Sequence, residues 1–547
     1  MTPIRRVAGR TFSSLGSRNL RLYFSGLAIS QVGSWTVKLR SGGRRSVALS
    51  SEWGTARADA VTLLDAALNQ RLHTVTDATD DGRRVRNDAE TLAARDKQEA
   101  LTARFSTWVW ENPDRSERLA GRYNELFSSV VRIHAFAGKP WVRVLHTFVN
   151  DNVSDTFTTI RELHLATPRA AGTAGAPSRA LQHHDNAYAV TGEDGSVISS
   201  GRHHGGTLEV AAPDGCALIA VRHFSENYPK SLSVGPEGVT VGICPDVRHV
   251  SYDRDGYEAD RLYYYLTPEG YRFKCGVSRT HELFYGIAPE GSCAALRRDA
   301  RGFQSPPTVR PATEAVLRSG VLEGLAARDD ERLAAYEGYV AKSLEGYLQD
   351  RAETRAWGML NFGDWFGERR YNWGNMEYDT PWAWLMEFLR GGDARCFALG
   401  EQAAWHLVDV DTCHAAADAG RIGGQYAHCV GHVGGYYPQG FREMATAEGY
   451  MGCSHMWVEG LFLYYALTGH EHIREWAEAT CRHLNGALLN DYDFSNCRDN
   501  GWNLLLQMAA FRATGDPFYL NACRIIVERT LERQSPGGGW HRQMVPG

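Results

Sequence analysis

The sequence NFGDWFGERRYNWGNMEYD, residues 361–379, is the segment around which the rest of the chain can be organised. It places aromatic side chains beside carboxylates, guanidinium groups, amides and glycines. A helix buried in a hydrophobic core would not contain so many charged, amide and glycine residues. Aromatic faces next to carboxylate, guanidinium and amide groups can bind a sugar ring and its acid group. We therefore predict that residues 361–379 form one wall of a carbohydrate-binding site.

The size and composition of the chain limit the function classes. Its 547 residues exceed the usual size of one hydrophobic core and predict two or three domains. With 43% hydrophobic and 22% charged residues, the composition is typical of a soluble globular protein. The net charge of -5 gives no basic surface for nucleic acid, so we expect no nucleic-acid partner.

The 11 cysteines are an odd number and show no CxxC or CxxH spacing. This pattern argues against a disulfide framework and against a structural zinc site. We expect isolated, buried cysteines that behave as small hydrophobic residues, and a reducing, cytoplasmic location.

Residues 1–37 differ in character from the rest of the chain. Basic residues lead into a weakly apolar run from Leu20 to Val37 that contains Arg21 and Gln31. A membrane-spanning helix needs about 20 mostly apolar residues, and a signal peptide needs a cleaner apolar core. The pattern SLGSRNLRLYFSGLAISQVGSW is similar to the first residues of major facilitator transporters. Because this resemblance stops at Val37, we expect a fused or misplaced start with no functional role and no membrane span.

Residues 38–304 are predicted to form a β-sandwich region. Ser129–Phe136 and Trp141–Asn150 are alternating runs joined by Ala137–Pro140, which predicts a hairpin. Similar turn signals recur at Pro213–Gly215, Gly235–Gly238 and Thr267–Gly270. Strands at this regular spacing are typical of antiparallel sandwiches.

Residues 305–547 are predicted to form a helical domain. From Thr313 the apolar spacing becomes helical, with one face formed by Leu333, Tyr336, Val340, Leu344, Tyr347 and Leu348. Helix pairs then recur around short glycine turns at Gly391–Asp393, Thr468–His470 and Thr514–Asp516. This repeat predicts an (α/α) toroid. A closed ring of six hairpins at roughly 45 residues each needs more chain than follows Thr313, so we expect an open or incomplete ring.

The repeat also predicts where the functional residues lie. Antiparallel helix pairs place their short turns at one end of the array, so the longer connections gather at the other end. These connections hold most of the domain's histidine, asparagine and aromatic-rich polar sequence. They are Asn361–Asp379, Asp411–Trp457, Asn490–Trp502 and the residues after Gln534.

The sequence GGQYAHCVGHVGGYY, residues 423–437, is a second dense polar segment. His428 and His432 have an i, i+4 spacing that would suit a metal on a helix. The neighbouring glycines favour a loop, however, and no HExxH glutamate is present. We therefore expect catalytic or sugar-binding histidines and no metal, with an ordinary structural role as the alternative. The sequence requires no cofactor and does not indicate calcium.

Histidine and tyrosine beside arginine and asparagine suit β-elimination at a uronic acid, in which a base removes the C5 proton and the C4 oxygen leaves. The carboxylate charge must first be neutralised, which arginine or an amide can do. We assign Arg369 and Asn375 to carboxylate binding. His428 or His432 is the predicted base, and Tyr436 protonates the leaving oxygen. We expect substrate contacts from Trp365, Trp373, Glu377, Tyr378, His455 and Trp457, and from Lys230, Arg279 and His281 in the β region.

Residues 361–379, followed by FLRGGD, resemble the exo-acting rhamnogalacturonan lyases (polysaccharide lyase family twenty-six and its uncharacterised bacterial relatives). Three segments of the β region are similar to that family's middle domain: RIHAFAGKPWVRVLHTFVND at 132–151, NYPKSLSV at 227–234 and GVSRTHELFYGI at 276–287. The resemblance covers roughly residue 46 to the C-terminus. It implies β-sandwich material before an (α/α) toroid, and β-elimination at a galacturonate linked to rhamnose in pectin.

Two other functions stay open at this point. A glycoside hydrolase acting on uronic-acid oligosaccharides would need two carboxylates across the scissile bond. Asp364, Glu368, Glu377 and Asp379 are candidates. Asp379 also suits a helix N-cap, and Glu368 suits an ion pair with Arg369. An inactive sugar-binding homologue is the third alternative.

Overall fold

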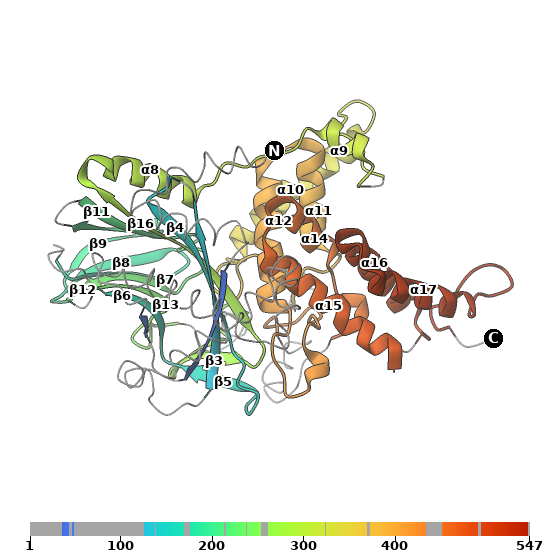
Figure 1. The fold of residues 1–547 in the computed structure, drawn as a ribbon, viewed down its shortest axis with the longest axis horizontal. Coiled ribbons are helices and arrows are strands. Elements are labelled where there is room, and N and C mark those ends of the chain that lie inside the picture. Colours follow the sequence, from blue (N-terminus) through green and yellow to red (C-terminus); the bar gives the residue numbers. More distant parts are fainter. Residues whose placement is uncertain are drawn as a thin grey trace, which may run out of the picture.

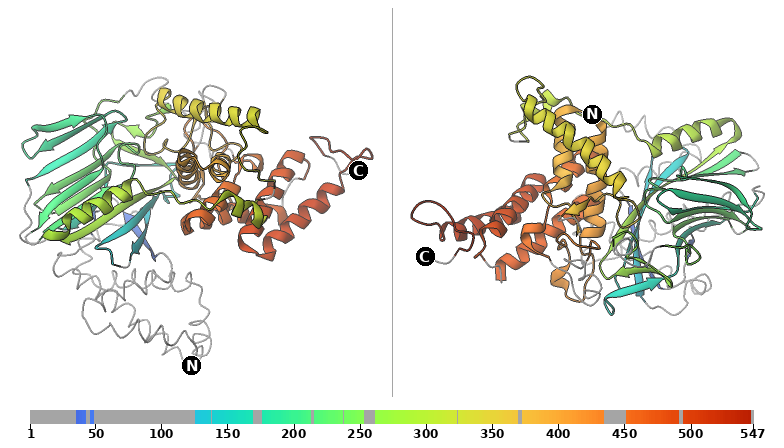
Figure 2. Two further views of the ribbon diagram at one scale, coloured as in Figure 1. Left: turned by 90° about the horizontal axis from the view of Figure 1, so that it is seen from above. Right: turned by 180° about the vertical axis from the view of Figure 1, so that it is seen from behind.

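The structure is a computed structural model of the chain, in which a β region lies beside a helical region (Figure 1). Figure 2 shows the same side-by-side arrangement from two other directions. The structure describes residues 35–42, 46–48, 125–136, 138–168, 176–212, 215–236, 238–252, 261–322, 324–368, 372–433, 451–490 and 494–544. The predicted N-terminal segment 1–37 lies outside this part except for its last residues, which belong to the first strand.

The first sheet of the β region has six antiparallel strands. Their order across the sheet is β1 (Trp35–Gly42), β3 (Glu125–Ala135), β4 (Trp141–Val149), β16 (Ser278–Pro289), β11 (Gly215–Val221) and β10 (Thr207–Ala212). Strand β1 crosses residue 37, where we predicted the first domain boundary. One face of this sheet packs into the sandwich, and the other carries side chains that contact the helical region.

The second sheet has seven strands and is antiparallel except where β2 pairs with β6. Their order is β2 (Ser46–Ala48), β6 (Leu163–Pro168), β13 (Gly238–Cys244), β12 (Lys230–Gly235), β7 (Ser178–His184), β8 (Ala187–Gly192) and β9 (Val197–Gly201). Apolar side chains from both sheets, such as Phe148, Leu232 and Val241, form one buried core. A small third sheet joins β14 (Leu266–Thr267), β15 (Gly270–Lys274) and β5 (Phe157–Ile160).

The predicted hairpins are confirmed. Strands β3 and β4 pair antiparallel through Ser129 and Phe148, as the alternation on either side of residues 137–140 indicated. The other three turn signals also connect paired strands, namely β10–β11, β12–β13 and β14–β15. Antiparallel sheets in this part of the chain are therefore shown, in agreement with the predicted sandwich.

Helix α8 (Cys293–Gln304) ends the β region and packs on β11 and β16 through Leu296 and Phe303. A disulfide joins Cys293, its first residue, to Cys216 in β11. This pair corrects our expectation of isolated cysteines, because strand pairing brings together two residues that are 77 positions apart. The other nine cysteines are not joined in disulfides, in line with our expectation.

The helical region begins with α9 (Thr313–Ser319) and α10 (Ala334–Glu353), followed in the described residues by three helical hairpins. The hairpins are α11 (Thr380–Gly391) with α12 (Ala394–His406), α14 (Glu459–Thr468) with α15 (Glu471–Asn490), and α16 (Cys497–Thr514) with α17 (Pro517–Leu531). In each hairpin the first helix ends at a glycine with positive φ: Gly392, Gly469 or Gly515. The predicted helix–turn–helix repeat is thus confirmed, whereas closure into a toroid stays a prediction.

The predicted apolar face of α10 is only partly buried. Leu344 is buried against α11 and α12, and Tyr347 packs edge-on against Trp384. Leu333 and Tyr336 at the start of the helix are exposed, although the Tyr336 hydroxyl donates to Glu387 of α11 at 2.8 Å. No helix in the described ranges is long and apolar enough to cross a membrane.

Buried polar contacts join the two regions along β16. The carboxylate of Asp409 accepts hydrogen bonds from the backbone N–H and the hydroxyl of Thr280, at 2.7 and 2.9 Å. Arg222 at the end of β11 binds Glu401 of α12 at 2.6 Å. Asp409 lies in η2 (Leu407–Asp411), a π-helical turn that continues α12. Such turns are frequent at functional sites because they re-aim side chains, and η2 lies between β16 and the long connections.

Candidate functional site

The segment 361–379 is held in place at its end by Asp379. The Asp379 carboxylate accepts a hydrogen bond from the N–H of Trp382 in the first turn of α11, as the predicted N-cap requires, and another from Gly460 in α14. Burial raises the pKa of this carboxyl to about 7. Asn375, Met376, Tyr378 and Asp379 have φ between 45° and 61°. Non-glycine residues in this conformation are strained and cluster at functional sites.

Asn375 connects this segment to residues 423–433. Its amide nitrogen donates to the carbonyls of Tyr426, Ala427 and His432, and its backbone N–H donates to Asp364. The side chain is 2% exposed. We predicted that Asn375 binds the substrate carboxylate, and its amide nitrogen is instead occupied by main-chain carbonyls. Asn375 therefore positions two connections relative to each other.

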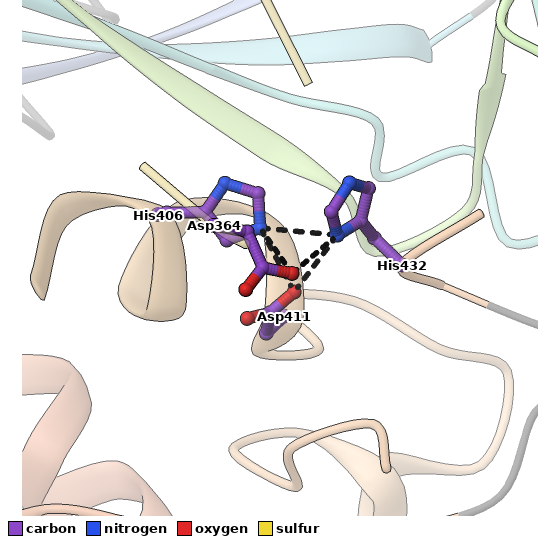
Figure 3. Close-up of side chains that lie close together, drawn as sticks. All are labelled: Asp364, His406, Asp411 and His432. Atoms are coloured by element: carbon purple, nitrogen blue, oxygen red, sulfur yellow. Dashed lines mark hydrogen bonds and ion pairs between the residues drawn. The ribbon is translucent and has the colours of Figure 1, made fainter. Parts of the chain in front are cut away.

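Asp364, His406, Asp411 and His432 form a fully buried group, which we call the four-residue cluster (Figure 3). Their side chains come from the segment 361–379, the end of α12, η2 and the loop 412–433, and they point toward one another (Figure 3). Nε2 of His406 lies 3.2 Å from both Nδ1 of His432 and Oδ1 of Asp411. Nδ1 of His432 lies 3.2 Å from Oδ2 of Asp364.

The outer atoms of the cluster have main-chain and amide partners. Nδ1 of His406 donates to the carbonyl of Phe362, and Nε2 of His432 donates to Oδ1 of Asn361. Two carbonyls accept from the amide nitrogen of Asn361, which fixes its orientation. Burial lowers the pKa of His406 to about 4, and burial with the nearby charge of Asp364 raises that of Asp411 well above its usual range.

Glu377, His428 and His455 form a second group, closer to the surface, which we call the Glu377 group. Nδ1 of His428 lies 2.7 Å from Oε2 of Glu377, and Nδ1 of His455 lies 3.6 Å from Oε1. Arg498 lies in the first turn of α16, with a guanidinium nitrogen 3.7 Å from Oε1 of Glu377. Its side chain is 33% exposed. Burial opposes ionisation of Glu377, but the bond with His428 and the nearby cationic groups outweigh burial and lower its pKa.

Aromatic residues lie close in the chain to members of the Glu377 group: Tyr378 follows Glu377, and Trp457 comes two residues after His455. Tyr378 is 66% exposed, and its ring lies 5.8 Å from that of Trp457 and 6.3 Å from that of the half-buried Trp502. Trp457 is itself 2% exposed and Trp373 is fully buried, so neither offers a face to a sugar, contrary to our prediction. Both pack within the domain, because Trp373 lies against His432 and Trp457 lies against Trp502.

Trp365 is half-buried in the segment 361–379. Its indole N–H donates to the hydroxyl of Thr380 at 3.2 Å. Its ring lies so close to Gly374 that a Cβ there would come within 2.1 Å of it. Trp365 therefore fixes the fold of this segment, and its predicted role in stacking stays a prediction.

The three predicted residues of the β region do not reach the Glu377 group. Lys230 is fully buried in the sandwich, where its ammonium donates to the carbonyls of Pro229 and Ile243. Arg279 and His281 lie on β16 beside a cavity of about 50 Å³, far below the roughly 300–1,000 Å³ of ligand pockets. Arg279 donates to the carbonyl of Phe362 and so supports the segment 361–379. A substrate-binding role for these three residues is therefore corrected to a structural one.

The remaining predicted residues are Arg369, Tyr436, His428 and His432. Arg369 and Tyr436 lie outside the described residues. His432, predicted as a possible base beside His428, belongs instead to the four-residue cluster. His428 and His432 lie in a loop, as the glycines indicated, and they face different groups.

Four functional candidates were missed by sequence reasoning. Arg498 and Trp502 lie in the predicted connection Asn490–Trp502, but neither residue was singled out. His406 is the last residue of α12. A single histidine on an apolar helix does not indicate that side chains from other segments contact it. Asp411 was recognised only as the start of a long connection.

Comparisons with known proteins give limited information. A profile described as Domain of unknown function (DUF8437) matches residues 24–129, most of which lie outside the described part. No curated protein matches this sequence. A solved structure named as a polysaccharide lyase is weakly similar to this chain, with a TM-score of 0.17 and 8% identity. That alignment covers 75% of this chain and 70% of the other. These values define neither the fold nor the activity, and the functional argument therefore depends on the site.

Proposed function

We propose that this protein is a polysaccharide lyase that cleaves a uronate-containing polymer by β-elimination, with His428 as the base. The observation that carries the proposal is the 2.7 Å contact between Nδ1 of His428 and Oε2 of Glu377. A carboxylate that accepts the Nδ1 proton leaves Nε2 as the basic atom and stabilises the imidazolium that forms after proton abstraction.

The proposed reaction needs a base, a proton donor for the leaving oxygen and a group that neutralises the sugar carboxylate. Nε2 of His428 removes the proton from C5 of the uronate, the C4–O bond breaks, and a double bond forms between C4 and C5. The departing oxygen takes a proton, a role that we continue to assign to Tyr436. Arg498 is partly exposed next to Glu377 and is suited to bind the carboxylate of the sugar, which lowers the barrier to removal of the C5 proton.

A rhamnogalacturonan-type pectin is the substrate that we propose, on the resemblance of residues 361–379 to the exo-acting rhamnogalacturonan lyases. The surface supports a sugar ligand through Tyr378, which is exposed beside the Glu377 group. Amphipathic aromatic rings with one free face suit the apolar side of a pyranose ring.

The geometry favours elimination over hydrolysis. Hydrolysis needs two carboxyl groups that both reach the substrate. Asp364 is occupied by the histidines of the four-residue cluster, and Asp379 is occupied in capping helices. Of the carboxylates that we considered, Glu377 is the one that contacts His428 and lies near Arg498.

The test is incubation of the full-length protein with rhamnogalacturonan and with other uronate polymers. We expect the ultraviolet absorbance of a conjugated, unsaturated uronate to grow with time. Release of reducing sugars without that absorbance would show a hydrolase. Calorimetric binding of oligosaccharide without turnover would show an inactive sugar-binding protein.

A further inference from the structure

The four-residue cluster has the geometry of a closed metal site. Four potential ligand atoms, Nε2 of His406, Nδ1 of His432, Oδ2 of Asp364 and Oδ1 of Asp411, all lie within 4.8 Å of one another. Five of the six distances between them are 3.2, 3.2, 3.2, 3.7 and 3.9 Å. A tetrahedron with metal–ligand bonds of about 2.0–2.2 Å has edges of about 3.3–3.6 Å. The atoms therefore already stand close to the corners of such a tetrahedron.

The hydrogen bonds of the two imidazoles fix which nitrogen carries the proton. Nδ1 of His406 and Nε2 of His432 each face an oxygen that only accepts, so both of these nitrogens are donors. In neutral imidazole the other nitrogen then has a free lone pair. These two lone-pair nitrogens face each other at 3.2 Å, which is unfavourable unless a cation lies between them.

The carboxylates point to the same conclusion. Asp364 and Asp411 are both 0% exposed, and in the described part of the chain their ion pairs go only to these two histidines. Oδ2 of Asp411 is buried without a hydrogen-bond partner among the described residues. Two ionised carboxylates buried side by side repel each other, and a divalent cation removes this repulsion.

The outer hydrogen bonds are those that support metal ligands. The carboxylate of Asp364 accepts from the backbone N–H groups of Trp365 and Asn375, at 2.7 and 3.0 Å. Both histidines donate their outer N–H to an oxygen. Partners of this kind orient the ligands of protein metal sites and fix the tautomer of the histidines.

We propose that Asp364, His406, Asp411 and His432 bind one divalent transition-metal ion of the zinc class. Two imidazole nitrogens and two carboxylate oxygens suit zinc and disfavour calcium and magnesium, which prefer oxygen ligands. All four ligands are fully buried, so the site is closed and structural. The ion joins the segment 361–379, η2 and the loop 412–433, which carries His428. This inference departs from our expectation of no metal and does not depend on the proposed lyase activity.

The test begins with the metal content of the full-length wild-type protein, purified without chelator and then equilibrated with zinc. We expect roughly one equivalent of metal per chain by elemental analysis. Replacement by cobalt should give the visible absorption of four-coordinate Co²⁺. Removal by a chelator should lower the melting temperature by roughly 5 °C or more, and added zinc should restore it.

Variants locate the site. Asp411→Asn and His406→Gln should lose the bound metal and the cobalt spectrum. His414→Gln is the matched control, because His414 is a buried histidine of the same loop whose ring packs on Trp476 instead; this variant should keep the metal. If the ligand variants do not fold, the cobalt spectrum and chelator response of the wild-type protein decide the question. Wild-type protein that takes up no zinc or cobalt, or ligand variants that retain a full equivalent, would overturn the proposal; the cluster would then hold a shared proton.

Discussion

Nδ1 of His428 lies 2.7 Å from Oε2 of Glu377, although the two residues are 51 positions apart and belong to different connections between helices. The contact depends on Asn375, whose amide holds the segment 361–379 against the carbonyls of the loop that carries His428. The proposed base and its carboxylate partner therefore come from two loops that the side-chain amide of Asn375 holds together.

The first prediction concerns this pair. Glu377→Gln should lower kcat on the uronate polymer about 100-fold with little change in KM, because the amide no longer stabilises the imidazolium form of His428. The rate is measured by the absorbance of the unsaturated product. Glu345→Gln, which changes an exposed carboxylate on α10, is the control and should have wild-type kinetics. An unchanged kcat in Glu377→Gln would remove His428 from its role as base.

The second prediction concerns Tyr378. Tyr378→Ala should raise KM for the polymer by about tenfold and leave kcat nearly unchanged, because an exposed aromatic face binds the sugar without taking part in the reaction. Tyr378→Phe keeps the ring and should retain most of the affinity. Steady-state kinetics separate these two effects. Equal KM values for the wild type and the alanine variant would show that sugars bind elsewhere.

The third prediction concerns the pH dependence of stability. Burial lowers the pKa of Lys230 from 10.5 to about 7, so between these values the unfolded chain binds a proton that the native protein does not. The free energy of unfolding should therefore rise with pH across this window, by up to about 1.4 kcal/mol per pH unit from this group. Below pH 7 both states bind the proton, and the group adds no further pH dependence.

Lys230→Met removes this titration. Urea unfolding from pH 7 to pH 10 should give a steeper rise for the wild type than for the variant. Parallel curves would mean that Lys230 keeps an ordinary pKa in the native protein.

The fourth prediction concerns the packing of α14 on α11. A Cβ at Gly460 would come within 2.3 Å of the backbone nitrogen of Trp382 and 2.5 Å of Oδ1 of Asp379, so Gly460→Ala should destabilise the protein by about 1–3 kcal/mol. Gly486 in α15 has open space around it, and Gly486→Ala should stabilise by up to about 1 kcal/mol. Thermal unfolding of the two variants measures the contrast. Similar melting temperatures would show that α14 can shift away from α11 without loss.

Much of the fold could be predicted from short-range signals. Gly392, Gly469 and Gly515 end helices in the left-handed conformation, which glycine adopts without steric cost, and the turns could therefore be read directly. Helix geometry then placed the long connections at one end, where Glu377, His428 and Arg498 now lie together.

The burial of individual side chains could not be predicted in the same way. We predicted that Trp373 and Trp457 stack on the substrate. In the structure His432 and Trp502 contact their rings, and the sequence gives no sign of these contacts. The four-residue cluster was missed for a related reason. Its members come from four separate segments, and an interior histidine such as His406 resembles an ordinary core residue until its neighbours are known.

The short turns at Gly392, Gly469 and Gly515 lie at the opposite ends of their helices from the loops that carry Glu377 and His428. The turn at Gly515 has open space around it, so a tag or a fused domain can be introduced there at low risk. The turn at Gly469 does not share this property, because the next residue, His470, lies 3.2 Å from Arg143 of β4. Engineering of the protein for immobilisation or labelling should use the Gly515 turn and leave the chemistry undisturbed.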